Sequence, residues 1–338
     1  MHCNSKLPVI AVITTGGTIA SSFNHVSKSI NFSLSGKDLI SSIPEVNEIA
    51  NIKLIERPPI SSPNFTVKLI LKLAKFIRET LRNEDVDGVV VVQGTDTMEE
   101  TSYLTNLICR TSHPVIFTGA MKSQHEPYAD SRGNLLAAIR TACTPGARDQ
   151  GTLVVMNQEI HSAREVIKVN SELISAFQSP GLGPLGYVYS DGVVIYRNAP
   201  LEPPLQVNCL QENVELIKCY LDMSDLLFKA CLENNVKGLV IEGFGLGNIP
   251  ESLFPVVKDI VKKGIPVVLC SRCLEGRVLD LYAYPGGGRR LKEIGLIFAG
   301  RLSGPKARLK LMAALGAGIK GKKLQAYFEQ EYLWRHKS

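Results

Sequence analysis

The sequence has no run of the roughly 18 to 20 consecutive apolar residues that a membrane-spanning helix needs. Its strongest apolar runs, such as residues 88–92, have the length of a strand. Short internal repeats and low-complexity tracts are also absent. With 45% apolar and 21% charged residues over 338 positions, the composition excludes a disordered or collagen-like chain, and the length suggests two domains. We therefore predict a globular protein without a membrane span.

A marked excess of one charge and a regular cysteine pattern are missing too. The 38 basic and 32 acidic residues leave a net charge of +6, spread along the chain with a denser basic stretch at 320–323, so we predict a solvated surface and no nucleic-acid partner. The eight cysteines have irregular spacings, which argues against a disulfide framework. Cys270 and Cys273 form a C-x-x-C pair, but no second pair of ligands lies nearby, and no two histidines have metal-ligand spacing. We predict reduced thiols and no metal.

The N-terminal segment has some features of an export signal, since Lys6 precedes an apolar run over 7–13 and small residues at 20–22 resemble a cleavage site. Cleavage there would remove the threonine motif around Thr18. We interpret the run as a first buried strand and predict a cytoplasmic protein.

Short β-branched runs alternate with helical patterns along most of the chain, which is typical of a parallel α/β sheet. We predict strands at 9–14, 88–92, 114–118, 152–156, 214–219, 238–242, 266–271 and 295–299, and helices at 64–82, 99–109, 221–233, 250–263 and 305–315. Between about 185 and 212 the pattern breaks into short strand-like pieces at 186–189 and 192–197 and a Pro-rich segment at 198–204. The predicted division is a domain over 1–190, a linker over 191–212 and a second domain over 213–338.

Two loops that follow predicted strands carry hydroxyl groups. The first, Thr14-Thr15-Gly16-Gly17-Thr18-Ile19-Ala20, has adjacent glycines that allow a tight turn and place Thr18 at the edge of the sheet. Alone it is a weak signal, because a plain strand-to-helix turn has the same residues and the G-x-G-x-x-G fingerprint is absent.

The second loop is Gln93-Gly94-Thr95-Asp96-Thr97-Met98-Glu99-Glu100-Thr101. Asp96 and Glu99 have the spacing of a capping box, so a well-capped helix start is the simple interpretation. That interpretation does not require two hydroxyls around the carboxylate. Such a cluster can bind an ammonium group through Asp96 while the Thr95 hydroxyl takes part in the reaction.

Together the two motifs closely resemble those of the bacterial-type L-asparaginase/glutaminase family, and most of all a cytoplasmic, type I L-asparaginase. The resemblance continues in family order over nearly the whole chain, through segments at 117–121, 134–135, 154–157 to Lys168, 183–187, 245–248 and 305–308. It implies a larger, flavodoxin-like N-terminal domain with a parallel sheet and a smaller, Rossmann-like C-terminal domain. It also implies hydrolysis of L-asparagine to L-aspartate and ammonia, with possible minor glutaminase activity and no cofactor. Members of the family form homotetramers or intimate homodimers, with active sites between neighbouring subunits, so the resemblance implies such an assembly here.

The resemblance also assigns catalytic roles. Thr18 is the expected nucleophile, which forms an acyl-enzyme that water then cleaves. A threonine hydroxyl is a weak nucleophile, so a neighbouring group must activate it. Thr95, Asp96 and Lys168 form the expected second catalytic group, in which Lys168 serves as a base only if burial lowers its pKa and Asp96 also binds the substrate's α-amino group. Either threonine can be the attacking group, and the two can share acylation and deacylation.

Three more positions match substrate contacts of the family. Ser62 is expected to hold the α-carboxylate, backbone groups at Ala120 and Thr95 to frame the attacked carbonyl, and Asn248 to reach a neighbouring subunit's site. Without the resemblance, Ser62 and Asn248 are as readily a loop serine and a loop-stabilising asparagine.

Two departures from the family pattern stand out. Family members usually carry a tyrosine on the loop after the first motif, which aligns near Asn31 and Phe32 here, but no tyrosine precedes Tyr103. Either His25 or Ser22 on that loop would therefore support Thr18, or the Thr95 cluster would activate the reaction. Pro63 replaces a glutamine and has neither that side-chain amide nor an N–H. We therefore expect a preference for asparagine over glutamine.

Two alternatives remain. The amidotransferase component of the archaeal type has the same motifs but carries an additional N-terminal domain, whereas only thirteen residues precede Thr14 here. A catalytically weakened amino-acid sensor would fit the missing tyrosine. The retained threonines and Lys168 favour an enzyme.

Overall fold

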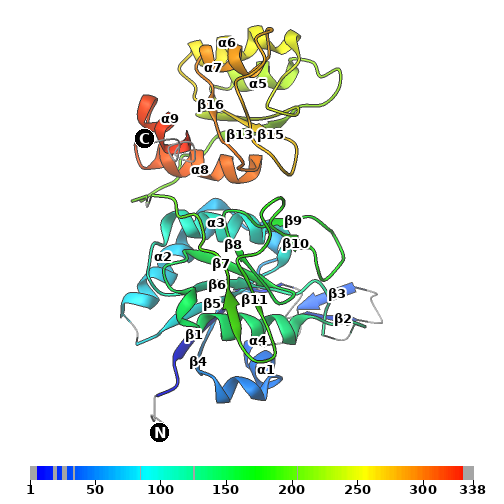
Figure 1. The fold of residues 1–338 in the computed structure, drawn as a ribbon, viewed down its shortest axis with the longest axis vertical. Coiled ribbons are helices and arrows are strands. Elements are labelled where there is room, and N and C mark those ends of the chain that lie inside the picture. The colour runs from blue at the N-terminus through cyan, green and yellow to red at the C-terminus, as the bar shows by residue number, and fades with distance from the viewer. Residues whose placement is uncertain are drawn as a thin grey trace. The chain divides into compact units, whose positions relative to one another are not determined.

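The protein is described by a computed structural model that covers residues 6–17, 21–24, 29–32, 35–83, 85–124, 126–203 and 205–329, with backbone only at 21–24, 29–32 and 83 (Figure 1). Packing divides the chain into two compact units, Met1–Pro204 and Leu205–Ser338. Within the described ranges, no helix is long and apolar enough to cross a membrane.

The first unit is built on an eight-stranded sheet with the order β12-β11-β8-β7-β6-β5-β1-β4. Neighbouring strands from β4 to β7 are parallel, and the last three pair antiparallel. The strands are β1 (Val9–Thr14), β4 (Asn51–Glu56), β5 (Gly88–Val92), β6 (Val115–Thr118), β7 (Thr152–Met156), β8 (Glu159–Ser162), β11 (Gly186–Val188) and β12 (Val193–Ile195). All residues of β5 are buried, as expected for a parallel strand covered on both faces.

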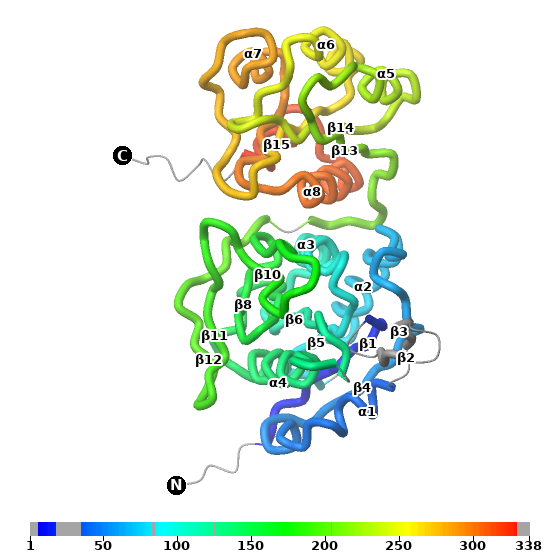
Figure 2. The backbone as a smooth tube through the Cα atoms, turned by 90° about the vertical axis from the view of Figure 1, so that its right-hand side faces the viewer, coloured from blue at the N-terminus to red at the C-terminus, as the bar shows by residue number. Residues whose placement is uncertain are grey.

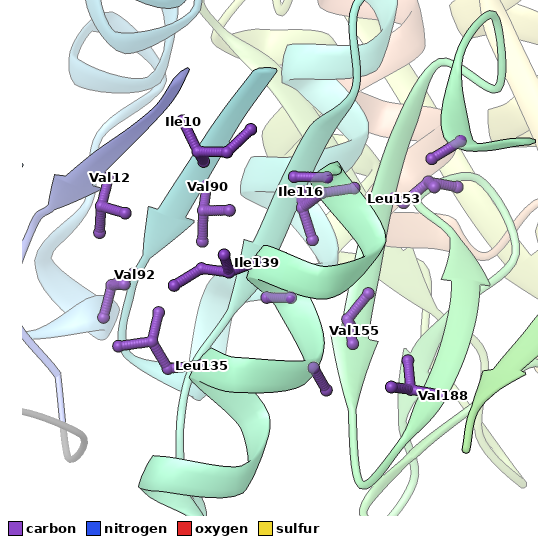
Figure 3. Packing of buried hydrophobic residues seen from close by; sticks show 14 of the residues in the cluster. Ile10, Val12, Val90, Val92, Ile116, Leu135, Ile139, Leu153, Val155 and Val188 are labelled. Carbon is purple, nitrogen blue, oxygen red and sulfur yellow. The ribbon is translucent and has the colours of Figure 1, made fainter. Parts of the chain in front are cut away.

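Helices cover both faces of this sheet. On one face, Leu135 and Ile139 of α4 (Ser131–Ala142) pack against strand residues such as Val90 and Val155 (Figure 3). The helix α1 (Gly36–Ser41) adds Leu39 to the same cluster. The helices α2 (Val67–Asn83) and α3 (Met98–Ile108) lie on the opposite side of the sheet (Figures 1 and 2).

Two small antiparallel pairs lie outside the large sheet. They join β2 (Ser21–Asn24) to β3 (Ser29–Phe32) and β9 (Ile167–Lys168) to β10 (Phe177–Gln178). The range 191–212, which we assigned to a linker, contains β12, where we predicted a strand-like piece at 192–197. This strand pairs with β11 and lies at the edge of the first sheet.

The second unit has a four-stranded parallel sheet in the order β13-β14-β15-β16. Its elements are β13 (Val214–Lys218), α5 (Leu226–Glu233), β14 (Gly238–Gly243), α6 (Phe254–Lys262), β15 (Val267–Ser271), α7 (Gly288–Glu293), β16 (Ile297–Phe298), α8 (Gly304–Gly316) and α9 (Gly321–Glu329). Phe228 of α5 and Leu269 of β15 lie in its buried core.

The predicted two-domain α/β fold is confirmed. The buried strands lie within about one or two residues of their predicted bounds, because continuous β-branched runs mark them clearly. The strand β4 was not predicted, because it is an edge strand with half of its residues exposed and lacks a continuous apolar run. The pattern analysis also missed α4, whose Gly133 weakens the helical pattern.

Candidate active site

The turn after β5, residues 93–97, is called the β5 turn below. It leaves the carboxyl end of the strand, where ligands collect in parallel sheets. A short 3-10 helix, Thr95–Thr97, runs directly into α3. Thr95 is buried, whereas the Asp96 side chain is 57% exposed. The turn thus carries a sheltered hydroxyl beside an accessible carboxylate.

Lys168 brings an amine to the β5 turn from a distant segment. Its Nζ donates to Thr95 Oγ1 at 2.9 Å and to Asp96 Oδ1 at 2.7 Å. Its side chain is only 15% exposed. The sequence therefore predicted three residues that the fold does bring together, although Lys168 lies 73 residues after Thr95.

The first motif approaches the same place. Thr15 donates from its N and its Oγ1 to the Val92 carbonyl, at 2.9 and 3.0 Å, which ties the loop to the end of β5. Gly17 has φ +105° and lies so close to Gly94 that a Cβ on it would fall 2.6 Å from the Gly94 Cα. A side chain at Gly17 would push the two loops apart. Thr18 itself lies outside the described residues.

Ser62 also contacts the β5 turn. It begins the 3-10 helix Ser62–Asn64, is 5% exposed, and its Oγ accepts a hydrogen bond from the Asp96 N at 3.2 Å. Thr97 Oγ1 donates to the Ser62 carbonyl at 2.8 Å. Because the Ser62 hydroxyl acts as acceptor toward Asp96, its own proton is available to an anion.

The turn after β6, residues 119–122, is called the β6 turn. It holds Ala120, which is 1% exposed. The Asp130 carboxylate accepts from the Met121 N at 3.1 Å and the Lys122 N at 2.9 Å. Asn134 Nδ2 donates to the Gly119 carbonyl at 3.0 Å. This turn is therefore held by its backbone.

Asp130 and Asn134 had no role in the sequence prediction. Asn134 appeared there only as part of a matching segment, yet it bridges three places in the fold. Its Nδ2 also donates to Asp130 Oδ2 at 2.9 Å, and its Oδ1 accepts from the Asn157 N at 2.8 Å. The burial of Asn134 and its place in the first turns of α4 are seen only in the structure, because the sequence pattern did not predict α4.

Two family models match the chain. A family model described as asparaginase, N-terminal, matches residues 9–201, and one described as glutaminase/asparaginase C-terminal domain matches residues 213–328. The chain belongs to the asparaginase family.

Among the family's relatives, an L-asparaginase from Bacillus licheniformis is 32% identical over 93% of this chain and 98% of its own length. A glutaminase-asparaginase from Pseudomonas fluorescens is 30% identical over 97% of this chain and 92% of its own length. The crystal structure of a probable cytoplasmic L-asparaginase from Campylobacter jejuni superposes with a TM-score of 0.84 at 33% identity, covering 95% of this chain and 99% of that one.

In this asparaginase-family chain, Glu99 does not take part in the capping box that the sequence suggested. The residue before α3 is Thr97, and it makes no side-chain cap, because the 3-10 helix continues straight into α3. The Glu99 carboxylate instead accepts a hydrogen bond from the Lys168 N at 2.6 Å. No sequence signal pointed to this contact, since the spacing of Asp96 and Glu99 suggested a local partner.

Asn248 belongs to the second unit and is described within that unit alone. Its backbone pairs with Phe244 through hydrogen bonds of 2.7 and 2.9 Å. Its buried Oδ1 has no hydrogen-bond partner among the described residues. This oxygen is a polar group without local compensation, which suits a contact from outside the turn.

The histidines and cysteines give no metal site in the described part of the chain. His161 lies in β8, is fully buried, and bonds through Nδ1 to Ser179 Oγ at 3.0 Å. His125 lies outside the described residues. No cluster of His, Cys, Asp and Glu within the described ranges could hold a metal ion. Cys270 and Cys273 are both free thiols.

Proposed function

We propose that this protein is an L-asparaginase that hydrolyses the side-chain amide of L-asparagine to L-aspartate and ammonia. One observation carries the proposal: the Lys168 Nζ lies 2.9 Å from Thr95 Oγ1 and 2.7 Å from Asp96 Oδ1. A hydroxyl and a carboxylate that both hydrogen-bond to one amine can support proton transfer to and from a weak alcohol nucleophile. Membership of the asparaginase family supports the same reaction.

The same groups suit an amino-acid substrate. Asp96 accepts a hydrogen bond from Lys168 through Oδ1, and its side chain is 57% exposed. Its carboxylate can therefore also accept a hydrogen bond from the substrate's α-ammonium group. The Ser62 hydroxyl can donate to the α-carboxylate, since it accepts from the Asp96 N. With both ends of the amino acid bound, the side-chain amide is directed to the threonines.

In the proposed reaction, the Thr18 hydroxyl attacks the amide carbon, and backbone N–H groups of Thr95 and Ala120 stabilise the oxyanion. The C–N bond then breaks, the leaving nitrogen takes up the proton that the Thr18 hydroxyl lost and departs as ammonia, and an aspartyl ester remains on Thr18. Water activated by the Thr95, Asp96 and Lys168 group cleaves this ester, which releases L-aspartate and restores the hydroxyl. No cofactor takes part. Thr18 enters through the motif it shares with the family.

Further proposals concern the location, assembly, domains and substrate preference of the enzyme. It acts in the cytoplasm, assembles as a homotetramer or intimate homodimer, and uses Asn248 of a neighbouring subunit at each site. Two domains, 1–190 and 213–338, carry these roles. Because Pro63 follows Ser62 in the 3-10 helix and offers no amide side chain, asparagine is preferred over glutamine.

The test is ammonia release from asparagine and glutamine by wild type, Thr18→Ala and Thr95→Ala. We expect activity on asparagine in wild type, a fall in kcat of about 10³-fold or more in each variant, and a lower kcat/KM for glutamine. Binding of asparagine without ammonia release would instead indicate an amino-acid sensor. Similar turnover of both amides would contradict the preference.

Mass spectrometry of rapidly quenched Thr95→Ala identifies the attacking group. If Thr18 attacks and the Thr95 cluster drives deacylation, the aspartyl ester accumulates on the peptide that contains Thr18. An ester on wild type's Thr95 peptide, with none on Thr18, would assign the attack to Thr95 instead.

A further inference from the structure

The strand that carries Lys168 is not fixed by the large sheet. The two-residue strand β9 pairs only with β10 in the described sheets. A strand of this length supplies few ladder hydrogen bonds, and a lysine side chain has many rotamers. Some other contact must hold Lys168 if its Nζ is to stay beside Thr95.

Glu99 provides such a contact at the backbone. The Lys168 N–H donates to Glu99 Oε2 at 2.6 Å, which is a short hydrogen bond to a charged acceptor. The next amide, that of Val169, donates to Ala176 at 2.8 Å in the paired segment. Successive amides of the strand therefore face opposite sides, and the one at Lys168 faces α3.

The amine and the backbone of Lys168 are thus both held by one short segment, residues 95–99, which joins the β5 turn to α3. The Nζ bonds to Thr95 and Asp96, and the backbone N bonds to Glu99 a few residues later. We infer that Glu99 is a positioning residue for the amide hydrolysis: it fixes the backbone of Lys168 so that the amine meets the Thr95 hydroxyl. The inference rests on the proposed function, and Glu99 acts through Lys168 without touching the substrate.

A purely structural role is the competing explanation, because Glu99 lies in the first turn of α3, where a negative charge favours the helix. The two roles predict different results. A helix-stabilising charge would change the melting temperature and leave the rate per folded molecule intact. A positioning contact changes kcat, since displacements of about 1 Å near reacting groups cost up to roughly a hundredfold in rate.

The variants are Glu99→Ala, which removes the acceptor, and Glu99→Gln, which keeps a carbonyl oxygen of nearly the same shape. Glu79→Ala is the matched control, because Glu79 is an exposed glutamate on the neighbouring helix α2 and its loss removes the same charge. We expect Glu99→Ala to lower kcat for asparagine roughly ten- to hundredfold with KM changed less than about threefold. Glu99→Gln should recover most of this loss, and Glu79→Ala should match wild type.

Coupling to Lys168 gives the decisive kinetic readout. In the background Lys168→Ala, adding Glu99→Ala should cause no further loss, because the residue to be positioned no longer has its amine. A loss in the double variant equal to the product of the two single losses would overturn the inference. So would a kcat for Glu99→Ala within twofold of wild type.

Hydrogen exchange separates this inference from the proposed function. The amide of Lys168 should exchange at least tenfold faster in Glu99→Ala than in wild type and Glu79→Ala, whether or not the protein is active. An unchanged exchange rate would show that Glu99 does not hold the Lys168 backbone, and it would overturn the inference. Faster exchange in Glu99→Ala, with a wild type that releases no ammonia, would overturn the proposed function, and with it a positioning role in that reaction, while leaving the hydrogen bond itself established.

Discussion

The β5 turn and the β6 turn follow neighbouring parallel strands, yet they are built in opposite ways. In the β5 turn, Thr95 and Asp96 direct their side chains to Lys168. In the β6 turn, Asp130 and Asn134 bind the backbone. One turn therefore offers side chains for chemistry, and the other offers a backbone held in place. Substitutions at the first should change the rate, and substitutions around the second should mainly change stability.

The largest effect is expected from Lys168→Met, which keeps much of the side-chain volume and removes the amine from Thr95. Loss of a proton-transfer group costs about 10²- to 10⁴-fold, so we expect kcat for asparagine to fall by about 10³-fold, with the urea midpoint little changed. Lys122→Met on the β6 turn is the control. Lys122 forms a surface ion pair with Glu172 at 3.1 Å, worth less than about 1 kcal/mol. Equal rate losses in both variants would erase the difference between the turns.

A medium effect is expected where the two turns meet. A Cβ on Gly119 would fall 2.7 Å from Met98 Cε and against the Gln93 carbonyl, so Gly119→Ala must separate the β6 turn from the β5 turn. We expect a loss of about 1 to 3 kcal/mol in the free energy of unfolding, measured in urea, together with a lower kcat.

Gly133→Ala is the matched control for that substitution. Gly133 lies inside α4, and a Cβ there meets nothing within 4 Å. Alanine should stabilise the helix by about 0.5 to 1 kcal/mol without changing kcat. A destabilising Gly133→Ala, or a neutral Gly119→Ala, would contradict the packing described for the two turns.

The smallest effect concerns pH. Just after the β6 turn, the hydroxyl and the backbone N–H of Ser123 lie against the Glu126 carboxylate and hold the pKa of Glu126 below its ordinary value. A lowered folded-state pKa contributes stability that is complete above the ordinary glutamate pKa of about 4.3 and is lost as the pH falls through the lowered value.

Glu126→Gln should therefore be less stable than wild type at neutral pH, by about 0.5 kcal/mol after solvent screening, and equal to it in acid. Urea unfolding between neutral and acidic pH measures the difference. If the difference in the free energy of unfolding between the two proteins grew in acid, the lowered pKa assigned to Glu126 would be contradicted.

The sequence predicted the strand before each turn because buried parallel strands are continuous apolar runs, as in residues 88–92. It also predicted Thr95, Asp96 and Lys168 as one group, though through family resemblance rather than through spacing. It did not predict Glu99, Asp130 or Asn134. Apart from the bond between Asn134 and Asp130, the partners described for them are backbone groups, which carry no residue identity, so no pattern of side chains marks them.

The sequence by itself determined that the chain is a two-domain α/β protein with hydroxyl-bearing loops after its first strands. The tertiary structure alone decided that the Lys168 amine reaches Thr95 across 73 residues, and that Glu99 holds the lysine's backbone. The physical reason is that hydrophobic periodicity is local, whereas these hydrogen bonds depend on the order of strands in the sheet. A two-residue strand such as β9 is too short to have any periodicity at all.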